Sequence, residues 1–183
     1  MQSPPGLQFL HCLKNDATGG TSLFMDSFKA VEVMAKKYPE ELRTLKTTPL
    51  AFEYKNDNKH FYYLRPTVEV LDINVDYLVS YAPMFQGQIP FHDHKLVSRF
   101  YEALKRFEIV IRENSYIHKT RMNPGDLVIF ANRRVLHGRE QFDATSGDRH
   151  LKGTYVSLDE FRDKVRRFVP HVEMGRLKVD GRE

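Results

Sequence analysis

Cysteine, glycosylation signals and long apolar runs are nearly or wholly missing from this sequence. Cys12 is the single cysteine among 183 residues, which excludes an intramolecular disulfide, and no Asn-x-Ser/Thr acceptor occurs. Both absences favour a reducing, intracellular setting, cytoplasmic or mitochondrial. No apolar run approaches the roughly 18–20 residues that a helix needs to cross a bilayer, so no membrane association is predicted.

Internal repeats and low-complexity segments are also missing, and neither a signal peptide nor a transit peptide is expected. Residues 1–6 have neither the basic and hydrophobic regions of a signal peptide nor the arginines of a transit peptide. The composition, 41% hydrophobic and 28% charged, is that of a globular domain. We therefore expect one domain over 1–183, with an ordered core from about 4 to 168 and a basic tail at 169–183.

A strong excess of one charge is absent too. The net charge of +4, from 28 Lys and Arg against 24 Asp and Glu, is weaker than nucleic-acid binders usually show. The basic segment 162–167 is a weak candidate for nucleic-acid binding, because Asp159, Glu160 and Asp163 dilute its charge. We expect no nucleic-acid partner, whereas an anionic small molecule fits the charge.

Short aromatic and β-branched runs alternate with turn residues over much of the chain. Strands are predicted at 7–13 (buried on both faces), 22–25, 50–54, 60–64, 68–71, 77–81, 127–130 and 149–156. Helices are predicted at 27–38, briefly from 39, at 95–114 and at 158–168, with 82–94 irregular. Asp26 or Ser27 can cap the first helix, and Pro39 ends it. Because helices do not alternate regularly with strands, we expect an α+β fold, with a jelly-roll-type double sheet.

One histidine and two arginines follow the apolar run 128–130, which is interrupted by a polar turn and resumes at Val135. His137 is followed by Gly138 and Arg139, and Arg149 opens the next strand. We predict that His137 and Arg149 stand on adjoining antiparallel strands and mark a metal and oxoacid site, since arginine offers a planar fork to a carboxylate. A hydrogen-bonded structural histidine beside a solvated basic edge is the alternative.

Several segments in the same order resemble the gamma-butyrobetaine and trimethyllysine dioxygenase family, within the taurine-dioxygenase-like iron(II), 2-oxoglutarate oxygenases. The segments are Pro4 to Cys12, Thr18 to Ser22, Asn123 to Asp126, Val128 to Arg139 and Arg149 to Tyr155. The resemblance covers roughly 4 to 168 and is weakest over 45–95.

This resemblance implies the C-terminal part of an oxygenase catalytic domain, with a double-stranded β-helix (jelly-roll) core that is incomplete on its N-terminal side. It implies Fe(II), 2-oxoglutarate and dioxygen, the hydroxylation of a trimethylammonium compound such as gamma-butyrobetaine or trimethyllysine, and a place in carnitine biosynthesis. It also leaves room for ascorbate as a cofactor and for a homodimer.

The same resemblance assigns roles to individual residues. His137 corresponds to the distal histidine of the iron triad. Tyr155 corresponds to an aromatic that encloses the trimethylammonium group, although a core tyrosine is an equal alternative. The positions that correspond to cosubstrate contacts are Arg149, Arg139, Ser22 and Leu10.

The family's first two iron ligands form a His-x-Asp motif shortly upstream of the Pro-Pro-Gly segment, and this sequence has no His-x-Asp. The motifs at 92–94 (His-Asp-His) and 171–173 (His-Val-Glu) are poor substitutes, and 80–83 lacks the asparagines that the family carries near the substrate. We therefore expect either a fragment of a longer enzyme or a degenerate member, inactive alone. The alternative is a truncated, non-catalytic relative that acts as a binding module.

Overall fold

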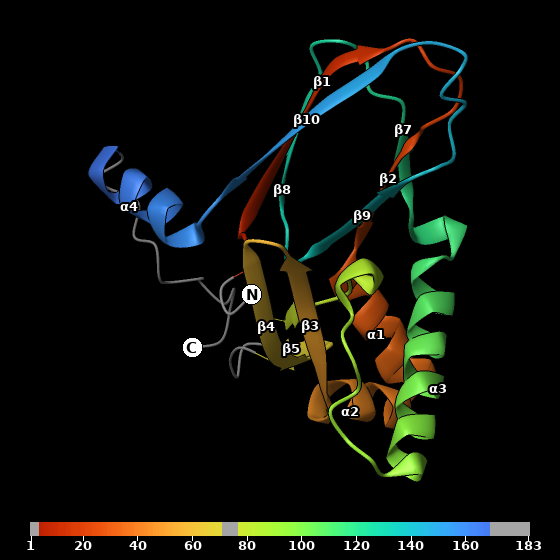
Figure 1. The fold of residues 1–183 in the computed structure, drawn as a ribbon. Helices are drawn as coiled ribbons and strands as arrows, with labels where there is room; N and C mark the ends of the chain where they lie inside the picture. Colours follow the sequence, from red (N-terminus) through yellow and green to blue (C-terminus); the bar gives the residue numbers. More distant parts are fainter. Residues whose placement is uncertain (1–3, 71–76, 169–183) are drawn as a thin grey trace, which may run out of the picture.

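Two three-stranded antiparallel sheets form one end of the molecule (Figure 1). They are seen in a computed structural model, which describes residues 4–70 and 77–168. The first sheet has the order β10-β1-β8, made of β1 (Leu7–Asn15), β8 (Leu127–Ala131) and β10 (Arg149–Val156). The second has the order β7-β2-β9, made of β2 (Ser22–Asp26), β7 (His118–Thr120) and β9 (Val135–Arg139).

The strand register shows which side of each sheet faces the other. Residues directly opposite in an antiparallel pair point to the same face, and Gln8 of β1 is opposite Phe130 of β8. The Phe130 ring lies 5.6 Å from the ring of Phe24 and 4.8 Å from the imidazole of His137, both in the second sheet. Gln8, Phe130, Phe24 and His137 therefore belong to the two inner faces.

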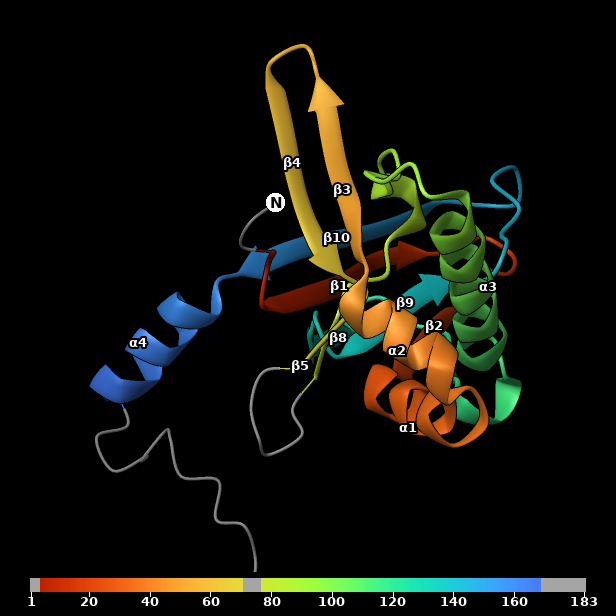
Figure 2. The ribbon, with the colours of Figure 1, turned by 90° about the horizontal axis from the view of Figure 1, so that it is seen from below.

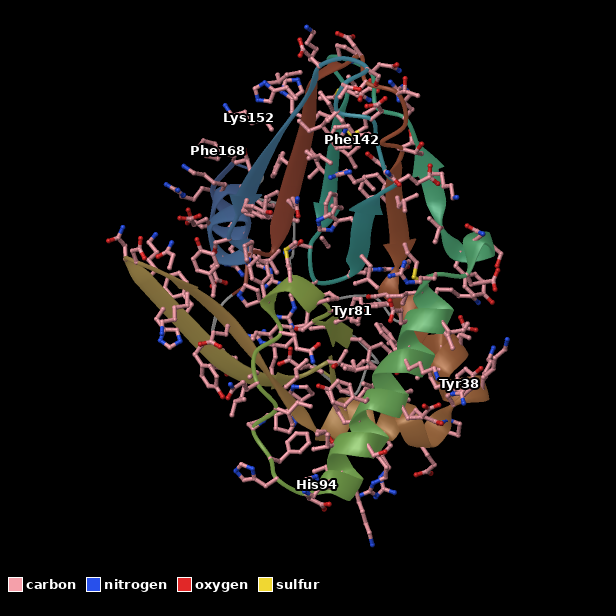
Figure 3. All side chains as sticks on the ribbon, turned by 45° about the vertical axis from the view of Figure 1, so that its right-hand side comes forward. Tyr38, Tyr81, His94, Phe142, Lys152 and Phe168 are labelled. Atoms are coloured by element: carbon pink, nitrogen blue, oxygen red, sulfur yellow. The ribbon has the colours of Figure 1, made fainter. Side chains whose placement is uncertain are left out.

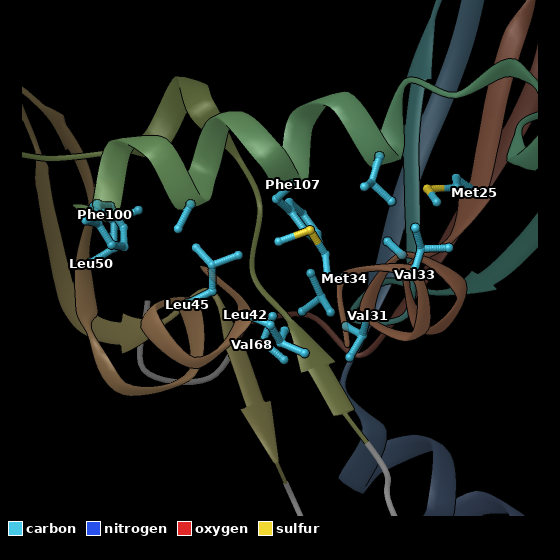
Figure 4. Packing of buried hydrophobic residues seen from close by; sticks show 14 residues of the cluster. Met25, Val31, Val33, Met34, Leu42, Leu45, Leu50, Val68, Phe100 and Phe107 are labelled. Atoms are coloured by element: carbon cyan, nitrogen blue, oxygen red, sulfur yellow. The ribbon is translucent and has the colours of Figure 1, made fainter. Parts of the chain in front are cut away.

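The apolar core lies beside the sheets, among three helices. These are α1 (Ser27–Lys37), α2 (Pro39–Thr47) and α3 (His94–Ile111). Phe100 and Phe107 of α3 are fully buried and pack in one cluster with Met34 of α1 and Leu45 of α2 (Figure 4). The apolar residues of α3 recur at intervals of three and four, so one face of the helix enters the cluster.

The helix boundaries have local causes. The Asp26 carboxylate caps α1 by accepting a hydrogen bond from the backbone amide of Phe28 at 3.0 Å. Pro39 occupies the first turn of α2, where its missing N–H costs no helical hydrogen bond. Asp93 caps α3 by accepting from the amides of Lys95 and Leu96. The predicted helices and the expected Asp26 cap are confirmed.

A long hairpin and a last helix extend from this body (Figures 1 and 2). The remaining elements are β3 (Pro49–Asn56), β4 (Lys59–Pro66), β5 (Val68–Val70), β6 (Tyr77–Val79), η1 (Pro83–Phe85), η2 (Asn114–Tyr116) and α4 (Leu158–Phe168). β3 pairs with β4 and β5 with β6, both antiparallel. None of the α4 residues, all of which the structure describes, is buried. Within 4–70 and 77–168, no helix combines the length and apolarity needed to cross a membrane.

Comparison with the sequence-based predictions confirms an α+β fold and corrects three points. The strand at 7–13 is not buried on both faces, because Leu13 is 42% exposed on the outer side of β1. Within 82–94, η1 interrupts the irregular stretch, and His94 already begins α3. β9 and β10 lie in different sheets, so His137 and Arg149 do not stand on adjoining strands. The predicted tail and the motif at 171–173 lie outside the described residues.

Candidate functional site

The two sheets are joined at the end remote from the helices, where Phe142 is labelled in Figure 3. Gly19, in the loop between β1 and β2, forms an isolated bridge with Phe142, and the amide of Gly20 donates to the carbonyl of Gln141 at 3.0 Å. Gly19 and Gly20 have φ of 81° and 71°, a region that glycine adopts readily. This loop therefore closes one end of the space between the sheets, which we call the intersheet space.

Arg121 holds the closing loop in place. Its guanidinium donates to the carbonyl oxygens of Asn15, Ala17 and Gly19, at 2.9, 2.7 and 2.5 Å. Three carbonyl acceptors on one planar guanidinium fix the path of the loop without neutralising the charge. Arg121 therefore contributes a positive charge to the closed end of the intersheet space.

Arg149 and Arg139 meet at this closed end from opposite sheets. The Cζ atoms of Arg149 and Arg139 lie 5.3 and 4.5 Å from the centre of the Phe142 ring. The Nε of Arg149 is buried and has no hydrogen-bond partner among the described residues. Burial, and then the charge of Arg139, lower the pKa of the Arg149 guanidinium. Within 4–70 and 77–168, neither arginine has an ion pair with a carboxylate, so the pair is suited to an anion.

Gly20 lies against the unpartnered Arg149 donor. A β-carbon placed on Gly20 would lie 3.0 Å from Arg149 Nε and 3.2 Å from Phe142 Cβ. A side chain at this position would therefore displace the unpartnered Arg149 donor.

Ser22 and His137 share the inner face of the second sheet. Ser22, which is 3% exposed, is opposite Arg139, and His137 is opposite Phe24. The imidazole keeps an accessible edge, yet burial lowers its pKa, an effect that a hydrogen bond with the Val135 backbone partly opposes. The lowered pKa favours the neutral form of His137, the form in which imidazole binds a metal.

Leu10 and Tyr155 share the inner face of the first sheet. Leu10 is opposite Gly153 of β10, and Tyr155 is opposite Gln8. Tyr155 is 56% exposed, so its ring is accessible among the described residues. The six residues singled out from the sequence thus all lie on the two inner faces, three on each sheet.

The metal donors are incomplete. Among the described residues, no group of three His, Cys, Asp or Glu side chains could hold a metal ion. Of the motif at 92–94, Asp93 is the cap of α3 and is engaged by backbone amides. His137 therefore supplies one donor of the three that a mononuclear iron triad needs, and the described residues do not fit an iron ion by themselves.

Sequence reasoning missed Gln8, Arg121 and Phe142. Gln8 interrupts an apolar run, which is a visible signal, but its burial depends on pairing with two distant strands. Phe142 and Arg121 lie in short connecting segments with no periodic pattern, so only the tertiary structure places them beside Arg149.

The sequence of this chain matches a known protein family. The model of the taurine catabolism dioxygenase TauD, TfdA family matches residues 1–155. The chain belongs to this family. The resemblance read from the motifs is thereby confirmed at the level of the family.

Proteins with similar sequences include a gamma-butyrobetaine dioxygenase and a trimethyllysine dioxygenase. Gamma-butyrobetaine dioxygenase from Pseudomonas sp. (strain AK-1) is 40% identical over 88% of this chain and 42% of that protein. Mitochondrial trimethyllysine dioxygenase from Homo sapiens is 34% identical over 90% of this chain and 40% of that protein. The chain therefore spans about two fifths of the length of these relatives.

Solved structures show the same fold. An asparagine oxygenase in complex with Fe(II), 2S,3S-3-hydroxyasparagine and succinate matches with a TM-score of 0.66 and 19% identity, over 89% of this chain and 49% of that one. AAD-2 in complex with Mn(II) and N-oxalylglycine matches with a TM-score of 0.66 and 14% identity, over 84% and 64%. At these identities the likeness concerns the fold.

Proposed function

We propose that this chain is the C-terminal part of the catalytic domain of an iron(II), 2-oxoglutarate-dependent dioxygenase. Its substrate is a trimethylammonium compound such as gamma-butyrobetaine, with trimethyllysine as the second candidate. The two sheets are then part of a jelly-roll core that is incomplete on its N-terminal side. The observation that carries the proposal is the buried, unpartnered Nε of Arg149 beside Arg139, on inner faces that also hold His137.

The cosubstrate suits the closed end of the intersheet space. A dicarboxylate brings the acceptor oxygens that Arg149 lacks, and a carboxylate taken out of water needs a cation and hydrogen-bond donors. The buried hydroxyl of Ser22 adds a donor on the face that carries Arg139. Leu10 offers an apolar wall on the opposite face.

The metal requires residues beyond those described. His137 contributes one imidazole, and we propose that a His-x-Asp segment ahead of Pro4 in a longer polypeptide contributes the other two ligands. Iron, when bound, supplies the chemistry that couples oxidative decarboxylation of 2-oxoglutarate to hydroxylation of a C–H bond. The part of this chain is to hold the cosubstrate and to orient the substrate.

Tyr155 is suited to the substrate. A quaternary ammonium cannot donate a hydrogen bond and is held by aromatic faces, at about 0.5–2 kcal/mol per contact. More than half of the Tyr155 side chain is accessible, and it lies on an inner face. The two relatives named above are supporting evidence, since their names specify trimethylammonium compounds.

The proposal is tested by measuring the binding of 2-oxoglutarate to the 183-residue chain with ligand-observed NMR. Arg149→Met is expected to weaken the affinity about 10- to 100-fold, because a charged hydrogen bond is lost. Lys152→Met, an exposed position on the same strand, is the matched control and should leave the affinity unchanged. Equal affinities in Arg149→Met and the parent chain would contradict the assigned role.

The reaction itself is tested in a longer protein. The part of the Pseudomonas relative that precedes the matched region is joined ahead of Pro4, and Fe(II), 2-oxoglutarate and gamma-butyrobetaine are added. Succinate should form in step with loss of gamma-butyrobetaine, and His137→Ala should abolish both. The 183-residue chain alone should consume no 2-oxoglutarate.

A non-catalytic relative is the second candidate, favoured by the single metal donor among the described residues. It also predicts 2-oxoglutarate binding that depends on Arg149, but no turnover in the joined protein. The two experiments together therefore separate the candidates.

A further inference from the structure

Gln8 is a buried polar residue that the proposed function has not used. It is 5% exposed, and its Oε1 is buried with no hydrogen-bond partner among the described residues. Its neighbours on the inner face of β1 are Leu10 and Cys12, so no side chain beside it along the strand competes strongly as a hydrogen-bond donor. A buried acceptor without a donor is unfavourable, whereas leucine or methionine would fill the same space at no such cost.

The position of Gln8 directs this acceptor towards the intersheet space. Gln8 is opposite Tyr155 on one side and Phe130 on the other, so the three side chains share one face. The Phe130 ring lies 4.8 Å from the imidazole of His137. Gln8 is thus flanked by the accessible aromatic ring and by the phenylalanine that contacts the single metal donor.

The two ends of the intersheet space carry different kinds of side chain. Arg149, Arg139 and Arg121 lie at the closed end, where they suit a carboxylate. Gln8 and Tyr155 lie far along β1 and β10 from that end, because Gln8 is opposite Tyr155 whereas Asn15 is opposite Arg149. The end near Gln8 thus pairs an uncharged acceptor oxygen with an aromatic face, and both are attracted to positive charge.

We propose that Gln8 is a substrate-contacting, specificity-determining residue whose Oε1 faces the cationic trimethylammonium group beside Tyr155. This inference rests on the proposed function. Methyl groups on a quaternary nitrogen carry partial positive charge and form C–H···O contacts with a carbonyl oxygen. A neutral amide attracts the cation without the cost of burying a carboxylate.

The test compares two ligands that differ in one charge, gamma-butyrobetaine and its carbon isostere 5,5-dimethylhexanoate. Affinities for the 183-residue chain are measured by NMR in the presence of 2-oxoglutarate. Gln8→Met keeps the length of the side chain and removes the acceptor, so the preference for the cationic ligand should fall about three- to tenfold. Gln8→Glu should raise that preference, because it adds a negative charge at the same place.

Thr154→Val, on the outer face of β10 next to Tyr155, is the matched control and should leave the preference unchanged. A second readout is the side-chain amide resonance of Gln8, identified by its loss in Gln8→Met. It should shift with gamma-butyrobetaine and not with the carbon isostere, which a purely structural glutamine would not do.

The possible failures can be told apart. If 2-oxoglutarate binding does not depend on Arg149, the proposed function fails. If that dependence holds, but the parent chain does not prefer gamma-butyrobetaine or Gln8→Met keeps the preference, the inference on Gln8 alone is overturned. A preference lost in Gln8→Met and strengthened in Gln8→Glu supports it.

Discussion

The layer formed by α1, α2 and α3 differs from the intersheet space in how apolar its buried side chains are. The helical layer holds the largest fully buried side chains, Phe100 and Phe107, within one apolar cluster. The intersheet space holds buried polar groups instead, among them Gln8, Ser22 and Asn15. Gln8 Oε1, Asn15 Oδ1 and Arg149 Nε have no hydrogen-bond partner among the described residues. The helical layer also has such atoms, Ser27 Oγ and Arg106 Nε, but they lie at its helices and not on the inner faces.

This difference separates the source of stability from the place of binding. Apolar burial stabilises the helical layer, since each large side chain removed from water contributes about 1.5–3 kcal/mol. Unpartnered buried polar atoms oppose folding, and a ligand in the intersheet space would complete the hydrogen bonds of those on the inner faces. Substitutions in the two regions should therefore separate stability from ligand affinity.

The largest effect is expected from Phe107→Ala in the helical layer. The change leaves a cavity at a fully buried position and should lower the free energy of unfolding by about 3–5 kcal/mol. Urea denaturation followed by circular dichroism measures it. Ile109→Ala, on the same helix but 49% exposed, is the matched control and should cost much less. Equal losses would mean that the cluster is not the main source of stability.

Arg149→Met should change the affinity for 2-oxoglutarate and leave the stability nearly unchanged. It places a methyl group where the unpartnered buried Nε stood and removes the rest of the guanidinium, so the free energy of unfolding should change by less than about 1 kcal/mol. The same variant should lose 2-oxoglutarate affinity. Calorimetric unfolding with and without 2-oxoglutarate measures both, and a loss of stability as large as that of Phe107→Ala would contradict the separation of the two regions.

Glu69→Gln tests a contact that joins the two regions. The Glu69 carboxylate of β5 accepts a hydrogen bond from Arg133, in the turn between β8 and β9, and lies 3.7 Å from Arg65. Both arginines are little exposed, so removing the charge should cost about 1–3 kcal/mol. Glu108→Gln, which removes an exposed pair with Arg112, should cost under about 0.5 kcal/mol in the same denaturation assay.

The smallest expected effect is on the stability of the chain at acid pH. It involves Asp26, which caps α1 and forms an ion pair with Arg134 in the turn before β9. Side-chain hydrogen bonds from Arg134 lower the pKa of the Asp26 carboxyl, so the folded state binds its proton less readily than the unfolded state. The resulting stability is present above the unfolded pKa, near 3.9, and is lost as pH falls through the folded pKa. Asp26→Asn keeps a capping oxygen and removes the charge.

We expect the unfolding free energy of Asp26→Asn to vary less between pH 5 and 2 than that of the parent chain, by up to about 1 kcal/mol. Chemical denaturation at each pH measures the difference. Asp57→Asn, in the exposed β3–β4 turn, is the control. Parallel pH curves for the parent chain and Asp26→Asn would contradict the assigned role of the ion pair.

Local pattern was sufficient for the elements whose stability is local. The spacing of apolar residues predicted α3 within a few residues, and the Asp26 cap needs only the amide of Phe28. β7 was missed, because its three residues, His-Lys-Thr, have no periodic pattern and are strand only through pairing with β2. Strand order was also beyond local reasoning, since β1 pairs with two strands more than a hundred residues further along the chain.

The candidate site also contains residues that the sequence predicted and residues that only the structure shows. The sequence singled out His137 and Arg149, but the expectation of adjoining strands was wrong because β9 and β10 belong to different sheets. The sequence could not show that Gln8 Oε1 is buried without a partner, because its burial depends on the packing of β1 between β8 and β10.

The outer face of the first sheet has a practical consequence for work with this chain. β8 is an edge strand among the described residues, and its outward side chains Leu127 and Ile129 are 52% and 53% exposed. An exposed apolar edge offers free backbone groups to another strand, so it favours self-association at high protein concentration. Ile129→Lys places a charge on the outer face of β8, directed away from the intersheet space, and is the substitution of choice for keeping the chain monodisperse during the titrations.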